Sequence, residues 1–129
     1  MMMASKQALV TGAASGIGRA VVNRLVTEDV SVIALDVDRE GLDAAFGDGV
    51  TKLVIDLGEQ DARQRAIEAA AGFDYLINAA GIIRLKPIAE FTVDEWRELM
   101  TVNAEAIFFL CQGIGPTMLP GDRPDHAAR

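Results

Sequence analysis

A glycine-rich turn near the N-terminus is the feature with the clearest chemical potential. Its residues, 11–18, follow a short apolar run and precede a segment with helical character. In a strand, turn and helix arranged in this order, backbone N–H groups and the positive end of the helix dipole meet a pyrophosphate, and glycines permit its close approach. No Gly-Lys-Ser/Thr follows the turn, which disfavours the phosphate-binding loop of ATP-hydrolysing proteins. The turn therefore predicts a diphosphate-binding site.

An acidic residue, Asp36, ends the next apolar run and follows the turn by about the 20 residues expected of a ribose-binding acid. A carboxylate can accept hydrogen bonds from both hydroxyls of an adenine ribose, whereas a 2′-phosphate would meet like charge at a cost of up to about 4 kcal/mol. Val37 is neutral, Asp38 adds a second negative charge, and we expect Arg39 to face solvent. The pattern predicts that NAD is preferred over NADP.

Four short apolar runs would position these residues, at 8–10, 30–35, 53–55 and 75–77. They are nearly continuous and rich in Val, Ile and Leu, as in strands buried on both faces. Segments with helical character alternate with them at 16–27, 39–46 and 60–71, which predicts an α/β fold with a parallel sheet covered on both sides. The runs end in Thr11, Asp36, Asp56 and Asn78. We expect these ends to share the carboxyl edge of the sheet, where open α/β folds bind ligands, although Asp and Asn also begin turns and cap helices.

The best-marked helix is expected to begin at about Val93, because Thr92 and Glu95 form a capping box. Helical periodicity places Asn103 in the middle of the helix's apolar stripe, so its amide is predicted to face inward. The stripe consists of Trp96, Leu99, Met100, Ile107 and Leu110.

Composition limits the possible classes of protein. The chain has 129 residues, of which 50% are apolar, enough for one domain with a sizeable core. A net charge of −7 disfavours nucleic acid as a partner. One cysteine and one histidine exclude an internal disulfide and disfavour a metal site. We find no signal peptide and no apolar stretch long enough to cross a membrane, so the chain is expected to be cytoplasmic and away from membranes.

The amino-acid composition changes after Gln112. Most of the chain's four prolines fall beyond this residue, and closely spaced prolines prevent a continuous helix. We therefore divide the chain into a partial dinucleotide-binding domain, residues 1–112, and an irregular or disordered tail, residues 113–129.

Taken together, these motifs resemble the short-chain dehydrogenase/reductase family over about residues 6–112. The resemblance is carried by the turn at 11–18, by Asp36, by Asp56-Leu57, by Asn78-Ala79-Ala80-Gly81 and by Asn103 within Val102-Asn103-Ala104. It implies a Rossmann-like, doubly wound parallel sheet with strand order 3-2-1-4, incomplete relative to the family, and NAD as cofactor.

The resemblance also implies roles for individual residues. The pyrophosphate would be held by Gly12, Ser15, Gly16, Ile17 and Gly18. Other cofactor contacts would come from Asp36 at the adenine ribose, Asp56 and Leu57 beside the adenine, and Asn78, Ala79 and Gly81 beside the central strand. Asn103 would be the asparagine of the family's catalytic tetrad, which bends its helix and holds a water in the proton relay. A buried asparagine can also be only a satisfied structural amide.

The sequence departs from the family pattern in its catalytic residues. Family members continue through a catalytic Ser and a Tyr-x-x-x-Lys helix, whereas the one tyrosine here, Tyr75, lies in an apolar strand and has Ala79 four residues on. We expect Tyr75 and Cys111 to be core residues. The chain is thus interpreted as the NAD(H)-binding portion of an oxidoreductase that interconverts a secondary alcohol and a ketone, inactive in isolation. The alternatives are a noncatalytic nucleotide-binding or partner-binding module and an inactive truncated fragment.

The resemblance bears on assembly as well. The last strand, residues 75–77, would be an edge of the sheet despite its apolar composition. The helix that carries Phe108 and Phe109 resembles the one through which family members form oligomers, so a homo-oligomer is expected.

Overall fold

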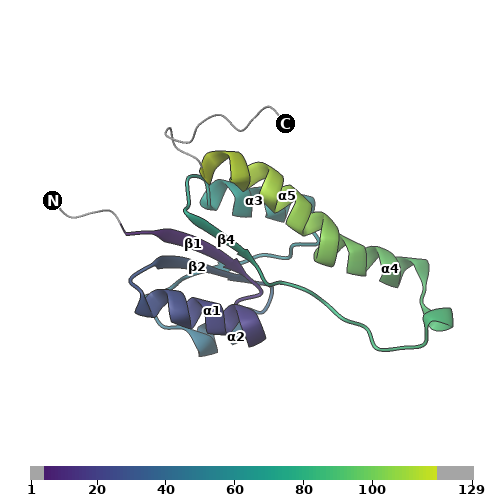
Figure 1. Ribbon diagram of the computed structural model, residues 1–129. Helices are drawn as coiled ribbons and strands as arrows, with labels where there is room; N and C mark the ends of the chain where they lie inside the picture. The colour runs from purple at the N-terminus through teal and green to yellow at the C-terminus, as the bar shows by residue number, and fades with distance from the viewer. Residues whose placement is uncertain (1–4, 119–129) are drawn as a thin grey trace.

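The computed structural model describes residues 5–118, which form a parallel sheet between two layers of helices (Figure 1). The strands are β1 (Gln7–Thr11), β2 (Ser31–Asp36), β3 (Thr51–Val54) and β4 (Tyr75–Asn78). Their order across the sheet is β3-β2-β1-β4, and every pairing is parallel. The structure confirms the predicted α/β class and the strand order that the resemblance implied.

Helices cover both faces of this sheet. Helices α1 (Gly16–Thr27) and α2 (Arg39–Ala45) lie on one face, and α3 (Gln60–Ala69) and α5 (Ala106–Ile114) lie on the other (Figure 1). Alternate residues of β1 serve the two layers: Val10 belongs to the core beneath α1 and α2, and Leu9 belongs to the core beneath α3 and α5. A central strand therefore needs an apolar residue at every position, which explains its nearly continuous apolar run.

The helical segment that leads into α5 begins where the capping box predicts. Helix α4 spans Val93–Met100, the Glu95 N–H donates to Thr92 Oγ1 at 3.1 Å, and the Thr92 N–H donates to the Glu95 carboxylate at 2.9 Å. A π-helical turn, η2 (Thr101–Glu105), then separates α4 from α5, and the Ala106 N–H donates to the carbonyl of Thr101 across it. The helix is therefore interrupted around Asn103, the residue at which the resemblance implies a bend.

The prediction that the apolar stripe of this segment faces inward is wrong for its first half. Trp96 is 58% exposed, Met100 and Asn103 are also exposed, and only the later position Leu110 is fully buried. Figure 1 shows the reason: α4 projects past the edge of the sheet, so no core lies beneath its apolar stripe. The wider π turn also changes the angular phase between α4 and α5, which a constant helical period does not capture.

Two further burial predictions are wrong. Tyr75 is 43% exposed, and Cys111 is exposed on α5. Tyr75 opens β4, which pairs with β1 alone among the described strands, so part of its ring lacks a neighbour. Both residues were assigned to the core from the apolar composition around them, and composition does not reveal which element lies at an edge.

Helical structure also continues further than expected. Helix α5 ends at Ile114 and a 3₁₀ turn, η3 (Gly115–Met118), follows, so the irregular segment expected from residue 113 does not begin there. Gly113 lies so close to α3 that an added Cβ would be 2.7 Å from Ile67 Cδ1, and Ile114 is fully buried. Pro116 lies in a first turn, where its missing N–H costs no hydrogen bond. Residues 119–129 of the expected tail lie outside the described residues.

None of the helices within residues 5–118 combines the length and the apolar character needed to cross a membrane.

Candidate nucleotide-binding site

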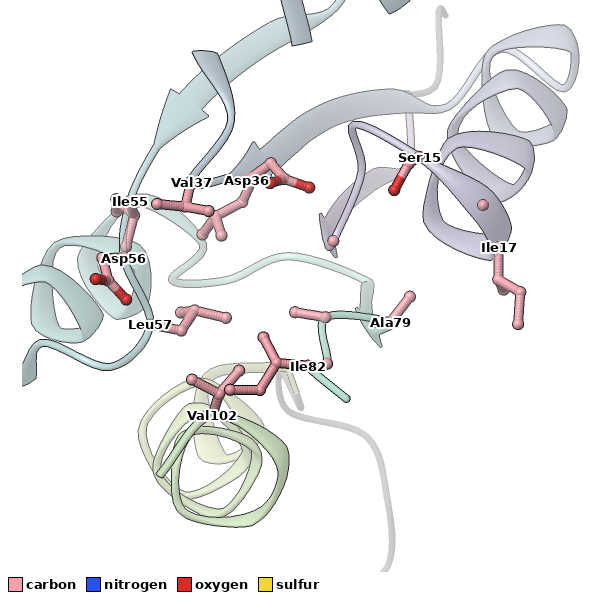
Figure 2. Close-up of a pocket in the computed structure, with 15 residues that line it drawn as sticks. Ser15, Ile17, Asp36, Val37, Ile55, Asp56, Leu57, Ala79, Ile82 and Val102 are labelled. Atoms are coloured by element: carbon pink, nitrogen blue, oxygen red, sulfur yellow. The ribbon is translucent and has the colours of Figure 1, made fainter. Parts of the chain in front are cut away.

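A cavity of about 350 Å³ opens at the carboxyl edge of the sheet (Figure 2). The segments that follow all four strands contribute to its wall, and η2 closes one side. The lining residues are Gly12, Ser15, Gly16, Ile17, Leu35, Asp36, Val37, Ile55, Asp56, Leu57, Ala79, Ala80, Gly81, Ile82 and Val102. The strand ends therefore meet at one edge, as the parallel topology predicts.

The turn after β1 packs directly against the segment after β4. Gly12 has a φ of +65°, and a Cβ there would lie 2.7 Å from the carbonyl oxygen of Ala79. Buried Thr11 joins the same two segments, because its Oγ1 accepts the N–H groups of Ala79 and Ala80 at 3.2 and 3.1 Å. This contact fixes the floor of the cavity.

The N-terminus of α1 is open toward the cavity. Ser15 occupies the cap position, yet its hydroxyl makes no capping hydrogen bond, and the first turn carries no acidic residue. The first-turn N–H groups of a helix lack intrahelical partners and carry partial positive charge. Gly18 lies behind them, and a Cβ there would collide with the carbonyl oxygen of Gly12. The arrangement leaves the donors free for an anion at the glycine turn.

Asp36 lies at the end of β2 with its carboxylate held in place. One oxygen accepts the Ala14 N–H and the other accepts the Asp38 N–H, both at 3.0 Å. The Asp38 side chain instead caps α2 by accepting the Gly41 N–H at 3.0 Å, and Asp38 does not line the cavity. A carboxylate has about four acceptor positions, so Asp36 retains two for a ligand.

The opposite side of the cavity is mostly apolar. Leu57, Ile82 and Val102 gather there (Figure 2), and Asp56 beside them accepts the Gly58 N–H at 2.8 Å. Several lining residues were not predicted as site residues: Leu35, Val37, Ile55, Ala80, Ile82 and Val102. All of them adjoin a predicted site residue in the chain, and this adjacency is the one signal that could have identified them.

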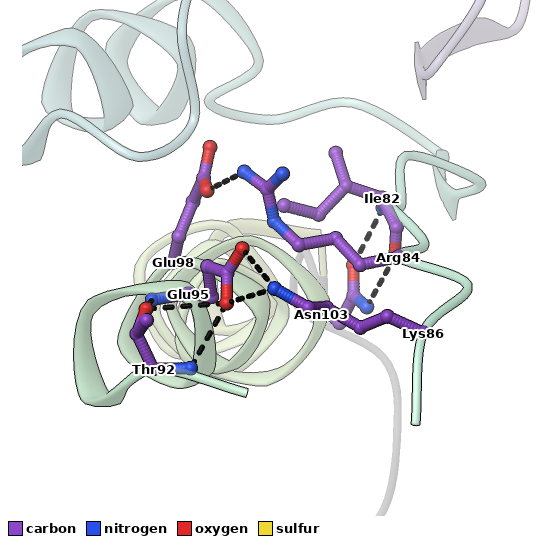
Figure 3. Close-up of polar contacts among 7 residues, drawn as sticks. All are labelled: Ile82, Arg84, Lys86, Thr92, Glu95, Glu98 and Asn103. Atoms are coloured by element: carbon purple, nitrogen blue, oxygen red, sulfur yellow. Dashed lines mark hydrogen bonds and ion pairs between the residues drawn. The ribbon is translucent and has the colours of Figure 1, made fainter. Parts of the chain in front are cut away.

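Asn103 stands next to the cavity but does not line it. Its Oδ1 accepts the Ile82 N–H and its Nδ2 donates to the Ile82 carbonyl, each at 2.8 Å (Figure 3). This pair of bonds fastens the segment after β4 to the π turn. The amide that was predicted to face inward is therefore exposed and engaged with backbone, because no core lies beneath this part of the helix.

Two ion pairs continue the attachment of this loop, which includes the 3₁₀ turn η1 (Ile88–Glu90). Lys86 Nζ lies 2.9 Å from both carboxylate oxygens of Glu95, and Arg84 pairs with Glu98 (Figure 3). The hydrogen bond from the Thr92 N–H, followed by that from Lys86, lowers the pKa of Glu95 from its usual 4.5 to about 2. Glu95 therefore keeps its negative charge in mildly acid solution, where a glutamate with the ordinary pKa would become protonated.

The structure brings most of the predicted cofactor residues to the cavity: Gly12, Ser15, Gly16, Ile17, Asp36, Asp56, Leu57, Ala79 and Gly81. It does not bring Gly18 or Asn78 to the wall. Gly18 supports the turn from behind, and Asn78 Nδ2 faces Cys111 Sγ at 3.6 Å while its Oδ1 is buried without a hydrogen-bond partner in the structure. Within residues 5–118, no three His, Cys, Asp or Glu side chains are placed to hold a metal ion.

Comparison with known proteins identifies the family. A family model described as short chain dehydrogenase matches residues 6–125. The chain belongs to the short-chain dehydrogenase family. D-threitol dehydrogenase of Mycolicibacterium smegmatis is 36% identical over 124 residues, which are 88% of this chain and 48% of that relative.

Two solved structures with bound nicotinamide dinucleotides are also similar to this chain. A 4-hydroxyisoleucine dehydrogenase complexed with NADH is 30% identical, with a TM-score of 0.79 over 87% of this chain and 49% of the other. A blue fluorescent protein from a metagenomic library, in complex with NADPH, is 27% identical, with a TM-score of 0.80 over 88% and 51%. Both nicotinamide dinucleotides thus occur among similar structures, and the chain spans about half the length of these relatives.

The close approach at Gly12 can be separated from its backbone conformation by a matched pair of substitutions. Gly16 also has a positive φ, +54°, but a Cβ there would meet nothing within 4 Å. Both Gly12→Ala and Gly16→Ala carry a left-handed penalty of about 1–2 kcal/mol, and we expect Gly12→Ala to lose a further ~2 kcal/mol through overlap with the Ala79 backbone. Urea unfolding of the two variants measures the difference, and equal losses would contradict the close contact.

Proposed function

We propose that the chain binds NAD(H) in this cavity, as the cofactor-binding portion of an oxidoreductase that interconverts a secondary alcohol and a ketone. The observation that carries the proposal is the pairing of the open α1 N-terminus with the fixed Asp36 carboxylate across one cavity. The first suits a pyrophosphate and the second suits a ribose diol, and a dinucleotide carries both groups.

The glycine turn fits the pyrophosphate by its lack of side chains. At Gly16, which lines the cavity, an added Cβ would enter open space, so its absence leaves the main chain of the turn accessible to the ligand. Gly16 and Ile17 begin α1 and would donate first-turn N–H groups, with the Ser15 hydroxyl beside them. Gly18 would act from behind the wall by letting α1 start close to β1.

Asp36 supports NAD over NADP. Its two backbone hydrogen bonds hold the carboxylate in one orientation, and the acceptor positions left over match the two hydroxyls of an adenine ribose. A 2′-phosphate at the same place would face a fixed negative charge, and the neighbouring Val37 offers no cation to offset it.

The rest of the cavity would hold the bases. Asp56 and Leu57 would lie beside the adenine, and Ala79 and Gly81 beside the remainder of the cofactor along the central strand, with Asn78 supporting them from behind. When bound, the nicotinamide supplies the position that accepts or donates a hydride.

Asn103 would hold a water of the proton relay. Both of its amide atoms bond to Ile82, yet Oδ1 keeps a second acceptor position and Nδ2 a second hydrogen. The exposed position beside the cavity leaves these free for water, and the Ile82 bonds would fix the orientation of the amide.

The Asp36→Asn variant tests the cofactor proposal with a side chain of the same size, whose one amide oxygen can accept only one of the two backbone N–H groups. We expect the ratio of NADH to NADPH affinity to fall by about 10- to 100-fold, because the variant weakens the ribose hydrogen bonds and removes the repulsion of a 2′-phosphate. Fluorescence titration with each dinucleotide measures the ratio. Asp38→Asn is the matched control, since it removes a charge two residues away outside the cavity wall. An unchanged ratio in Asp36→Asn would remove this residue from the ribose site.

A turnover assay tests whether the chain binds the cofactor without catalysing the reaction. Tyr75 is the one tyrosine in the sequence and lies outside the cavity wall, with Ala79 where the family pattern has lysine. We expect the 129-residue chain to bind NADH but to oxidise secondary alcohols such as D-threitol at close to the blank rate with NAD. NAD reduction followed by absorbance checks this, with Gly12→Ala as the control for cofactor binding. Turnover well above the blank would show that the chain contains its own general acid/base.

We also propose that the chain forms a homo-oligomer through α4 and α5. The proposal rests on the resemblance of this segment to the oligomerising helix of the family and on its apolar surface. Trp96, Met100 and Phe108 are exposed along one hollow of about 510 Å³. Patches of this kind on soluble proteins commonly mark protein contacts.

Substitution of one ring in this hollow tests the oligomer. Phe108→Asp places a charge at the centre of the proposed contact, so sedimentation velocity is expected to shift toward the monomer. Tyr75→Asp is the matched control, because it charges an exposed aromatic position on β4 instead. A shift in the control alone would assign the contact to the β4 edge and would contradict the proposal.

A further inference from the structure

A buried cation outside the cavity has no role in the function proposed above. Arg63, on α3, is the one charged residue within residues 5–118 that is buried, with 8% of its side chain exposed. Its Nη1 lies 3.0 Å from a carboxylate oxygen of Glu105, and its guanidinium stands 5.4 Å from the ring centre of Phe109. Burial of a charge is costly unless it is paired, so this arrangement needs both partners.

The two partners of Arg63 lie on either side of one junction. Glu105 is the last residue of the π turn, and Phe109 lies one helical turn further along α5. Arg63 therefore contacts the segment on both sides of the place where the π turn returns to an α-helix. A π turn is rare and less favourable than a regular helix, so an external contact is required to hold it.

The π turn sets the direction of Asn103. Each residue of an α-helix turns the chain by about 100°, so removal of the extra residue from the turn would rotate Asn103 away from the segment after β4. In the observed turn, the Asn103 amide reaches both the N–H and the carbonyl of Ile82, which lines the cavity. Asn103 and Glu105 are two residues apart, about 200° around a helix, so the contact at Ile82 and the contact at Arg63 lie on opposite sides of one helical turn.

We propose that Arg63 and Glu105 are positioning residues: their ion pair holds the π turn and thereby holds the Asn103 amide on Ile82 at the wall of the cavity. The pair touches neither the cavity nor Asn103, so it acts through the turn. The inference goes beyond the proposed function and depends on it only for what Asn103 does there. The Asn103–Ile82 bonds form in the chain without cofactor, so they can be measured whether or not NAD binds.

Hydrogen exchange of single amides separates positioning from general stability. The Ile82 N–H reports the bond to Asn103, and the N–H groups of Leu9 and Val10 in β1 report the core. In Glu105→Gln and in Arg63→Met, we expect Ile82 to exchange at least about tenfold faster relative to Leu9 and Val10, because the loss of one partner leaves the other charge unpaired. The double variant should accelerate Ile82 no more than the worse single variant, since both remove the same contact.

Matched variants complete the experiment, which NMR can follow residue by residue. Asp43→Asn breaks the ion pair with Lys52, 3.1 Å long and remote from the turn, and should leave the Ile82 ratio unchanged. Arg63→Lys keeps the charge but loses the planar fork, so it should give an intermediate ratio. If Arg63→Met does not fold, the half-exposed Glu105 carries the test through Glu105→Gln. Equal acceleration of all three amides, or an Ile82 amide unprotected in the unmodified chain, would overturn the proposal.

Discussion

The contact between the Gly12 turn and the backbone of Ala79 and Ala80 is the constraint on which the cavity depends. Thr11 contributes a single hydroxyl oxygen that accepts two N–H groups from the segment after β4, and Gly12 contributes the absence of a side chain. Together they join the ends of two adjacent parallel strands. The donors of α1 then face the same space as the wall after β4, so a ligand at the turn contacts both.

A second group of backbone contacts orients the acidic side of the cavity. Asp36 is held by the N–H groups of Ala14 and Asp38, so the turn after β1 and the turn after β2 share one carboxylate. The charge of Asp36 is therefore placed by the fold before any ligand binds. Preorganised groups of this kind cost little to order on binding, which is why they discriminate between related ligands.

The loop after Gly81 is held in place mainly by polar side chains. The amide of Asn103 bonds to its backbone, and its side chains Arg84 and Lys86 form ion pairs with glutamates of α4, a helix that lies beyond the sheet. These attachments are polar and largely exposed, in contrast to the apolar core beneath α5. The π turn connects the apolar core to this polar loop. Its Glu105 pairs with Arg63 on the core side, and its Asn103 bonds to Ile82 on the cavity side.

Local patterns in the sequence determined the strands, the capped start of α4 and the polar residues that follow the strands, whereas most individual residues of the cavity wall were implied by the family resemblance. Each of these local patterns depends on neighbours in the chain: an apolar run, a capping box, or a polar residue at the end of a strand. Parallel pairing then brings the strand ends to one edge without further information.

The tertiary structure alone decided which of these residues are exposed and which reach the cavity. Tyr75 and Cys111 are apolar in context yet exposed, and Gly18 and Asn78 stand behind the wall that they were predicted to form. The direction of Asn103 depends on a π turn, and that turn is held by a partner on α3 more than 40 residues earlier, as the Arg63–Glu105 separation of 42 residues shows. Burial and side-chain direction are properties of packing between distant segments, which no local period encodes.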